Sequence, residues 1–216
     1  MARAVLVVVA LFGSSPTSAG AGEEDTTRIG GALYHGKSVG ELIRDLGHED
    51  YRARQSAAEG LGYLGMEASQ AVPALAAALD DEVHVVRLAV AHALRAMAPA
   101  ARSAVPALTR ALGDHLSDVR VEVAYALAGI GPDARLAVPA LAQALGDRPV
   151  RLAAARALGS IGADAKSASA ALEQALRDET DASVRNEIHW AIERVHWQEP
   201  AQRSSSRPES PEANEP

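Results

Sequence analysis

The sequence predicts an all-α solenoid of about five two-helix units, and three observations support this fold class. The string Ala-Val-Pro-Ala-Leu begins at Ala71, Ala104 and Ala137, so that successive copies lie 33 residues apart. Each copy is followed by apolar residues at helical spacing. Alanine and leucine dominate a composition that is 48% hydrophobic but only 3% aromatic, which suits close helix packing and not a β-sandwich. Self-similarity at such a period indicates a stacked helical array.

Five units align on the copy that begins at Ala104. They cover residues 38–70, 71–103, 104–136, 137–167 and 168–197. The fourth unit is shorter because its turn at Asp147–Val150 has two residues fewer than the matching turn at Asp114–Val119.

The first helix of each unit carries apolar residues at positions i, i+3 and i+7. These residues are Val39/Leu42/Leu46, Val72/Leu75/Leu79, Val105/Leu108/Leu112 and Val138/Leu141/Leu145, while the fifth unit has Ser169/Leu172/Leu176. Proline at positions 73, 106 and 139 falls in the first turn, where its missing N–H removes no helical hydrogen bond.

The second helix of each unit carries a wider apolar stripe at positions i, i+4, i+7, i+8 and i+11, which predicts one broad buried face. The stripes are Ala53/Ala57/Gly60/Leu61/Leu64, Val86/Val90/Ala93/Leu94/Met97, Val119/Val123/Ala126/Leu127/Ile130, Val150/Ala154/Ala157/Leu158/Ile161 and Val184/Ile188/Ala191/Ile192/Val195. Gly65, Gly131 and Gly162 follow three of these helices and are interpreted as C-terminal stops.

Two polar columns accompany the stripes. Aspartates stand in the turn between the two helices, with His48 in that slot of the first unit, and arginines begin the second helix. The columns are Asp81, Asp114, Asp147, Asp178 and Arg54, Arg87, Arg120, Arg151, Arg185. A row of anion sites is one interpretation. The structural one, which we favour, has the aspartates cap the turn while each arginine pairs with an aspartate of its own or a neighbouring unit.

The N-terminus has the three-part layout of a secretory signal peptide over residues 1–21. Arg3 gives a basic start, Ala4–Phe12 is apolar, and Gly13–Pro16 breaks the run before cleavage sites after Ala19 or Ala21. The apolar run is about half the ~20 residues that a membrane-spanning helix needs. Residues 22–37 are interpreted as a linker. Residues 198–216, rich in proline, serine and glutamate, are interpreted as a disordered tail.

Residues Gly31–Ser38 match the phosphate-binding pattern G-x-x-x-x-G-K-[ST]. A phosphate loop needs a buried apolar strand just before it, and the polar run Glu23–Ile29 cannot supply one. We therefore expect no nucleotide, and interpret the segment as a turn with Ser38 as the N-cap of the first helix.

The repeated pattern A-V-P-A-L, D, V-R, A-L, I-G resembles the short HEAT repeat, in particular the HEAT-like repeats of phycobilisome lyases. The resemblance covers Ser38 to about Trp197 and implies a right-handed superhelix whose second helices line the concave surface. The ankyrin T-P-L-H signature and the tetratricopeptide pattern are absent.

Two columns on the predicted open side of the second helices are the candidate binding residues. The first is Glu59, His92, Tyr125, Arg156, Trp190, and its neighbour is Gln55, Leu88, Val121, Leu152, Asn186. They describe a groove with an apolar middle and polar ends, and Tyr, Trp and Arg are frequent anchors of protein interfaces. A solvated helix face is the alternative. For Trp190 a second alternative is that it caps the solenoid. Tyr34, Trp190 and Trp197 lie in or beside the end units, which must cover the exposed ends of the core.

The function predicted from the sequence is an exported, periplasmic or extracellular, non-catalytic scaffold that binds another exported or membrane-associated protein. A net charge of −7 gives no electrostatic footprint for nucleic acid, and the absence of cysteine excludes disulfides, thiol nucleophiles and an N-terminal lipid anchor on cysteine. No cofactor, metal or catalytic residue is expected. The alternative is a lyase or a metal-dependent modifying enzyme on the same repeats. The iron-binding His-Glu pairs of the HEAT-like deoxyhypusine hydroxylase have one counterpart here, His48-Glu49, and it lies in a predicted turn.

Overall fold

The computed structural model describes residues 33–197, so the predicted signal peptide, most of the predicted linker and the predicted tail lie outside the described residues. The α-helices are α1 (Val39–Asp45), α2 (Tyr51–Leu64), α3 (Val72–Ala78), α4 (His84–Ala96), α5 (Val105–Ala111), α6 (Ser117–Ile130), α7 (Val138–Ala144), α8 (Arg151–Ile161), α9 (Ser169–Asp178) and α10 (Ala182–His196). Short 3-10 helices follow four of them: η1 (Gly65–Ala71), η2 (Ala100–Ala104), η3 (Gly131–Ala137) and η4 (Gly162–Ala168). Across residues 33–197 no helix combines the length and the apolar character that crossing a bilayer requires.

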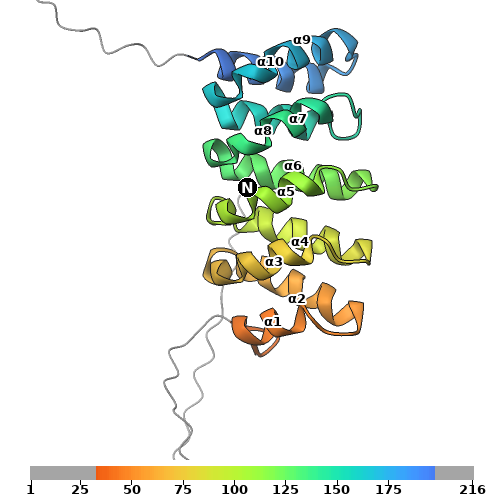
Figure 1. The fold of residues 1–216 in the computed structure, drawn as a ribbon, viewed down its shortest axis with the longest axis vertical. Helices are drawn as coiled ribbons and strands as arrows, with labels where there is room; N and C mark the ends of the chain where they lie inside the picture. The colour runs from red at the N-terminus through yellow and green to blue at the C-terminus, as the bar shows by residue number, and fades with distance from the viewer. Residues whose placement is uncertain (1–32, 198–216) are drawn as a thin grey trace, which may run out of the picture. The chain divides into compact units, whose positions relative to one another are not determined.

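These helices form a stack of five two-helix units, which confirms the predicted α-solenoid (Figure 1). The odd-numbered helices form one layer and the longer even-numbered helices form the other. The predicted stripe of the central unit, from Val119 to Ile130, is buried along its whole length, and so is the stripe of the second unit from Val86 to Met97. The stripes of the two end units are less complete, since Ala53 and Val184 are only half-buried.

The even-numbered helices pack against one another along the stack, whereas the short odd-numbered helices touch each other little. Small residues allow this close approach. A methyl group added at Gly62 of α2 would lie 3.0 Å from the Cα atom of Ala93 in α4, and one added at Gly129 of α6 would lie 2.7 Å from the Cβ atom of Ala98. The even-numbered helices therefore form a closely packed layer.

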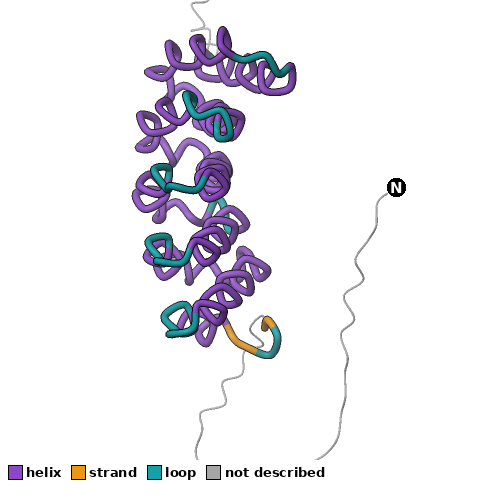
Figure 2. The backbone as a smooth tube through the Cα atoms, turned by 90° about the vertical axis from the view of Figure 1, so that its right-hand side faces the viewer, coloured by secondary structure: helices purple, strands orange, loops and turns teal. Residues whose placement is uncertain are grey.

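The 3-10 helices, which the sequence pattern did not predict, contact the odd-numbered helices on either side of them. Figure 2 shows the stacked helices in purple with short loops between them. The predicted glycine stops are confirmed. Gly65, Gly131 and Gly162 have φ values of 54°, 72° and 75°, a region that favours glycine, and each ends an even-numbered helix.

The end of the predicted linker is a two-stranded hairpin, β1 (Leu33–Tyr34) and β2 (Lys37–Ser38), that leads directly into α1. His35 and Gly36 form its turn, both with positive φ. Ser38 is the N-cap of α1, as predicted, and forms a capping box with Glu41. Lys37 pairs with Asp45 at 2.7 Å. The part of the G-x-x-x-x-G-K-S match that the structure describes is thus a hairpin and a helix cap.

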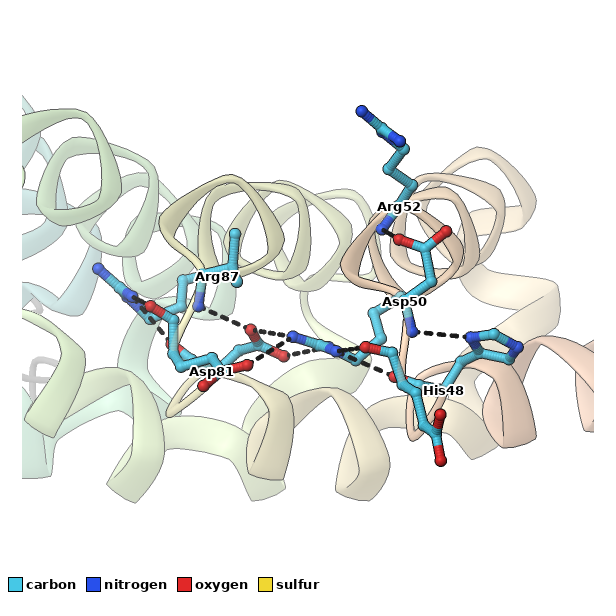
Figure 3. A network of polar contacts seen from close by, with 9 residues as sticks. His48, Asp50, Arg52, Asp81 and Arg87 are labelled. Carbon is cyan, nitrogen blue, oxygen red and sulfur yellow. Dashed lines mark hydrogen bonds and ion pairs between the residues drawn. The ribbon is translucent and has the colours of Figure 1, made fainter.

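The polar columns form a ladder along one edge of the stack, as the structural interpretation predicted (Figure 3). The first four arginines each reach into the next unit. Arg54 donates from Nε to Asp81 at 2.7 Å, and Arg87 donates from Nε to Asp114 at 2.6 Å. The Nη1 atom of Arg87 also donates to the carbonyl oxygens of Asp81 and Glu82 in its own unit. One guanidinium therefore joins two successive turns.

The aspartates also cap their own turns, as predicted. Asp81 accepts a hydrogen bond from the N–H of Val83 at 2.8 Å, and Asp114 accepts one from Leu116 at 2.9 Å. His48 stands in the same slot of the first unit, where its Nδ1 accepts from the N–H of Asp50 at 3.0 Å. The imidazole thus replaces the turn cap at the N-terminal end of the ladder.

Burial alone would raise the pKa values of Asp81 and Asp114, but hydrogen bonds from the arginines and from backbone N–H groups outweigh it. The pKa of each carboxyl is therefore held below its ordinary value, by Arg54 and Val83 for Asp81 and by Arg87 and Leu116 for Asp114. Both carboxylates are therefore ionised and paired with their arginines at neutral pH.

The prediction for Asp178 is wrong, because Glu179 fills its place in the ladder. Arg151 pairs with Glu179 at 2.8 Å, while Asp178 ends α9, is exposed and accepts from Gln174. Glu179 accepts from the N–H groups of Thr180 and Asp181, and these bonds lower its pKa. The reason is register: α9 is three residues longer than the other short first helices, which moves the turn along the chain.

Arg185 ends the ladder. Its Nη1 donates to the carbonyl oxygens of Leu176 and Glu179, and within residues 33–197 it has no carboxylate partner. The sequence could have placed Glu179 in the ladder, since it precedes Arg185 by six residues, the same spacing as from Asp81 to Arg87 and from Asp114 to Arg120.

Candidate protein-binding face

The two candidate columns lie on the solvent side of the even-numbered helices, and together they define the groove face. Half-buried apolar side chains run along it at Leu88, Val121 and Leu152. Beside them Glu59, His92, Arg156 and Trp190 are exposed, and Tyr125 is half-buried. The α2–α4–α6–α8–α10 packing places one position of each column on every even-numbered helix.

A shallow hollow of about 340 Å³ lies on the groove face between α2, α4 and α6. Four of the predicted residues line it, and three further residues that were not predicted complete it. The lining is Gln55, Glu59, Leu88, His92 and, in addition, Val85, Ala89, Glu122. Apolar residues of α4 form the floor, and carboxylates from α2 and α6 stand on opposite sides.

The two carboxylates of the hollow differ in their partners. Glu59 accepts one hydrogen bond, from the neutral side-chain amide of Gln55 at 2.8 Å. The Oε2 atom of Glu122 lies 2.9 Å from Nε of Arg95, yet it is buried and makes no hydrogen bond among the described residues. The pair is close enough for charge attraction, but its alignment leaves the oxygen without a directed donor.

Next to the hollow, Tyr125 of α6 lies between two arginines from the neighbouring helices. The guanidinium carbons of Arg95 and Arg156 each lie 5.9 Å from the centre of its ring, within cation–π range. Arg156 donates two hydrogen bonds to Glu187 of α10, at 2.9 and 2.8 Å, and this bonding raises the pKa of the already strongly basic guanidinium. Contacts along the groove face thus connect α4, α6, α8 and α10.

Aromatic rings pack onto glycines at both ends of the stack. A methyl group added at Gly159 of α8 would lie 2.3 Å from Cζ3 of Trp190, and one added at Gly60 of α2 would lie 2.5 Å from Cδ1 of Tyr34. Trp190 nevertheless keeps 39% of its surface exposed. Trp190 therefore packs against α8 and still keeps part of its ring exposed on the groove face. Trp197 is largely exposed at the end of α10.

Sequence reasoning brought together Gln55, Glu59, Leu88 and His92 but missed Glu122, Arg95 and Glu187. The structure places Val121 and Leu152 outside the lining of this hollow, and Trp190 farther along the stack. Glu122 and Glu187 share one signal that could have found them: both stand three residues after the first position of their helix stripe.

Acidic, basic, aromatic and aliphatic side chains make up the groove face. Over residues 33–197 no group of three or more His, Asp or Glu side chains is arranged to hold a metal ion. His48 and Glu49 lie in the turn before α2, as predicted.

Solved structures similar to this chain are helical repeat proteins. An engineered protein shares 28% sequence identity with a TM-score of 0.63, over 74% of this chain and 79% of that one. The complex of CpcE and CpcF of phycocyanin lyase from Nostoc sp. PCC7120 shares 26% identity with a TM-score of 0.62, over 80% of this chain and 69% of that one. A designed armadillo repeat protein in complex with the peptide (KR)4 has a TM-score of 0.64, over 73% of this chain and 82% of that one. At 19% identity it shows the fold alone.

No curated protein matches the chain. The family model of HEAT repeats matches residues 39–128 and 117–193, which together span most of the chain and all five of its units. The match begins at the first residue of α1 and ends within α10. This chain belongs to the HEAT-repeat family.

Proposed function

We propose that the chain is a non-catalytic scaffold that binds a segment of another protein along the groove face. The observation that carries the proposal is the hollow between α2, α4 and α6. There a row of half-buried apolar side chains continues into a concave site with polar groups on its rim. Apolar surface with a polar rim is the usual composition of a protein interface. The similarity to the CpcE–CpcF complex, in which two proteins assemble with each other, supports a partner that is itself a protein.

A selection of dodecapeptides against the full chain tests the proposal, with affinities measured by fluorescence anisotropy. Leu88→Arg places a charge on the floor of the hollow, and we expect it to weaken binding at least tenfold. Leu136→Arg is the matched control, because Leu136 is 69% exposed in η3, outside the hollow, and should leave affinity unchanged.

His92→Ala provides a second variant on the exposed rim of the hollow, where truncation should not disturb folding. Circular dichroism spectra identical to wild type would establish that all three variants fold. If no peptide is selected, or if Leu88→Arg and Leu136→Arg weaken binding equally, the groove face is not the binding site.

The proposed partner is an exported or membrane-associated protein, because residues 1–21 have the layout of a secretory signal. Expression in a bacterial host followed by intact-mass analysis tests this part. The secreted or periplasmic protein should begin at Gly20 or Gly22. A full-length chain retained inside the cell would contradict export.

A lyase subunit is the second candidate, and the similarity to phycocyanin lyase at 26% identity favours it. The two candidates predict different fates for the partner. A scaffold leaves the mass of a captured partner unchanged, whereas a lyase changes that mass by the group that it adds or removes. Intact-mass spectrometry of the partner before and after incubation distinguishes them.

A further inference from the structure

We infer that the hollow between α2, α4 and α6 takes one long basic side chain, arginine or lysine, from the bound segment. The inference rests on the proposed function and adds the chemistry of the residue that the segment must carry. It follows from two features of the hollow: an apolar floor and acidic side chains on opposite sides.

The floor suits the aliphatic part of such a side chain. Val85, Leu88 and Ala89 come from successive turns of α4, and all three are half-buried. Basic side chains bury their methylene groups along apolar surface while the charged end stays with polar groups or water. A short acidic or polar side chain would leave this floor uncovered.

The sides of the hollow suit the charged end. Glu59 has only the neutral amide of Gln55 as a hydrogen-bond partner among the described residues, so its charge is not neutralised. Glu122 stands on the opposite side, where its side chain is 24% exposed and its Oε2 is buried beside Nε of Arg95. An incoming guanidinium or ammonium group would donate N–H hydrogen bonds to Glu59 and place a positive charge near both carboxylates.

The charges around the hollow disfavour an acidic side chain of the bound segment. Its lining contains two carboxylates and no lysine or arginine. Arg95, the nearest paired cation, faces Glu122 and balances only that one charge. A carboxylate of a partner would be repelled by Glu59. A metal ion is not favoured either, since the described residues contain no three-ligand group that could hold one.

Two synthetic dodecapeptide libraries test the inference on the full chain. One fixes arginine at the central position, and the other fixes citrulline, which has nearly the same shape and no charge. The remaining positions are random and identical in composition. We expect the tightest binders from the arginine library to bind at least tenfold more tightly than those from the citrulline library, by fluorescence anisotropy.

Variants of the hollow then locate the effect. Glu59→Gln and Glu122→Gln should each reduce the preference for arginine to less than threefold. Glu67→Gln is the matched control, because Glu67 is exposed in η1 outside the lining of the hollow, and it should preserve the preference.

The outcomes separate this inference from the proposed function. If neither library gives a binder, the proposed function itself fails. Citrulline binders as tight as arginine binders would overturn the inference and leave the binding function standing. A preference for arginine that survives both Glu59→Gln and Glu122→Gln would overturn it too, because the charge would then be recognised elsewhere. If 1,5-diaminopentane competes as strongly as the peptides, the hollow is a small-amine site and the inference is wrong.

Discussion

The ladder edge and the groove face both contain arginine–carboxylate pairs between neighbouring units, but they differ in burial and in repetition. On the edge, Arg87 and Asp114 expose 8% and 7% of their side chains, and the same pairing recurs in successive units. On the groove face, Arg156 and Glu187 expose 48% and 17%. Arg156 stands at a different repeat position from Arg95, although Glu187 and Glu122 stand at the same one. The difference teaches that pairs of one chemical kind have two roles here. Buried, repeated pairs hold the stack together, and exposed, unrepeated ones shape a surface.

The largest expected effect is on the edge. Asp114→Asn removes the charge that faces the buried guanidinium of Arg87, and we expect a loss of about 3–5 kcal/mol in the free energy of unfolding. The control is Asp147→Asn. Asp147 and Arg120 expose 31% and 20% of their side chains, so the same change there should cost about 1 kcal/mol. Urea unfolding followed by circular dichroism measures both. Equal losses would show that burial does not decide how much an arginine–aspartate pair of the ladder stabilises the fold.

The effect of Asp114→Asn on stability should also depend on pH. The pKa of Asp114 is lower in the folded chain than its ordinary value, so its charge stabilises the fold at neutral pH. That contribution begins to fall as pH drops toward the ordinary value near 4 and is lost once pH passes below the folded-state pKa. Asp114→Asn lacks the contribution at every pH. The stability difference between wild type and variant should therefore shrink with acidification below about pH 5, and a constant difference would contradict the assignment.

The second comparison uses the two sides of α6. Leu127 is fully buried, and Leu127→Ala should cost about 2–5 kcal/mol because it leaves a cavity in the core. Tyr125 is two residues away on the groove face, and Tyr125→Ala should cost about 1–2 kcal/mol, mainly through its contacts with Arg95 and Arg156. Peptide binding should show the reverse order, with the larger loss for Tyr125→Ala. The same order in both measurements would mean that Tyr125 acts only through stability.

Features that recur from unit to unit could be predicted from the sequence. The buried stripes, the glycine stops and most of the ladder are visible because each residue type returns at a fixed interval, as Arg54 and Arg87 do. Four of the seven residues that line the hollow could also be predicted, since each position of a helix column faces the same side of the stack.

Contacts that occur once could not be predicted in this way. The arginines of the Arg95–Glu122 and Arg156–Glu187 pairs stand at different repeat positions, and the position that the two glutamates share is acidic in only two of the five units. Glu179 replaced Asp178 in the ladder because the length of α9 shifts the turn, and an alignment by residue type concealed that shift. The 3-10 helices were missed because their length of five to seven residues is too short to establish a hydrophobic period.

The third effect concerns how the last unit is attached. Gly159→Ala would place a methyl group 2.3 Å from Cζ3 of Trp190, and we expect a loss of about 1–3 kcal/mol as the indole is displaced. The control is Gly40→Ala in α1. No atom lies within 4 Å of the added methyl group there, so alanine should stabilise the chain by about 0.5–1 kcal/mol. Unfolding midpoints that move in opposite directions would confirm the packing role of Trp190. If Gly159→Ala left the stability unchanged, the indole of Trp190 could move away from α8 with no loss of stability.

The smallest expected effect is at Arg156. Arg156→Ala removes an exposed pair with Glu187 and one face of the contact with Tyr125, and we expect a loss of about 0.5–1 kcal/mol in stability. The loss should decrease further in 1 M salt, where screening weakens exposed pairs. Peptide affinity is the measurement that separates the two surfaces, because Arg156→Ala should weaken it several-fold while Asp147→Asn, with a similar small effect on stability, leaves it unchanged. If Arg156→Ala lowered the free energy of unfolding by more than about 2 kcal/mol, the Arg156–Glu187 pair would hold the stack together as the buried ladder pairs do. The distinction between the edge and the groove face would then be lost.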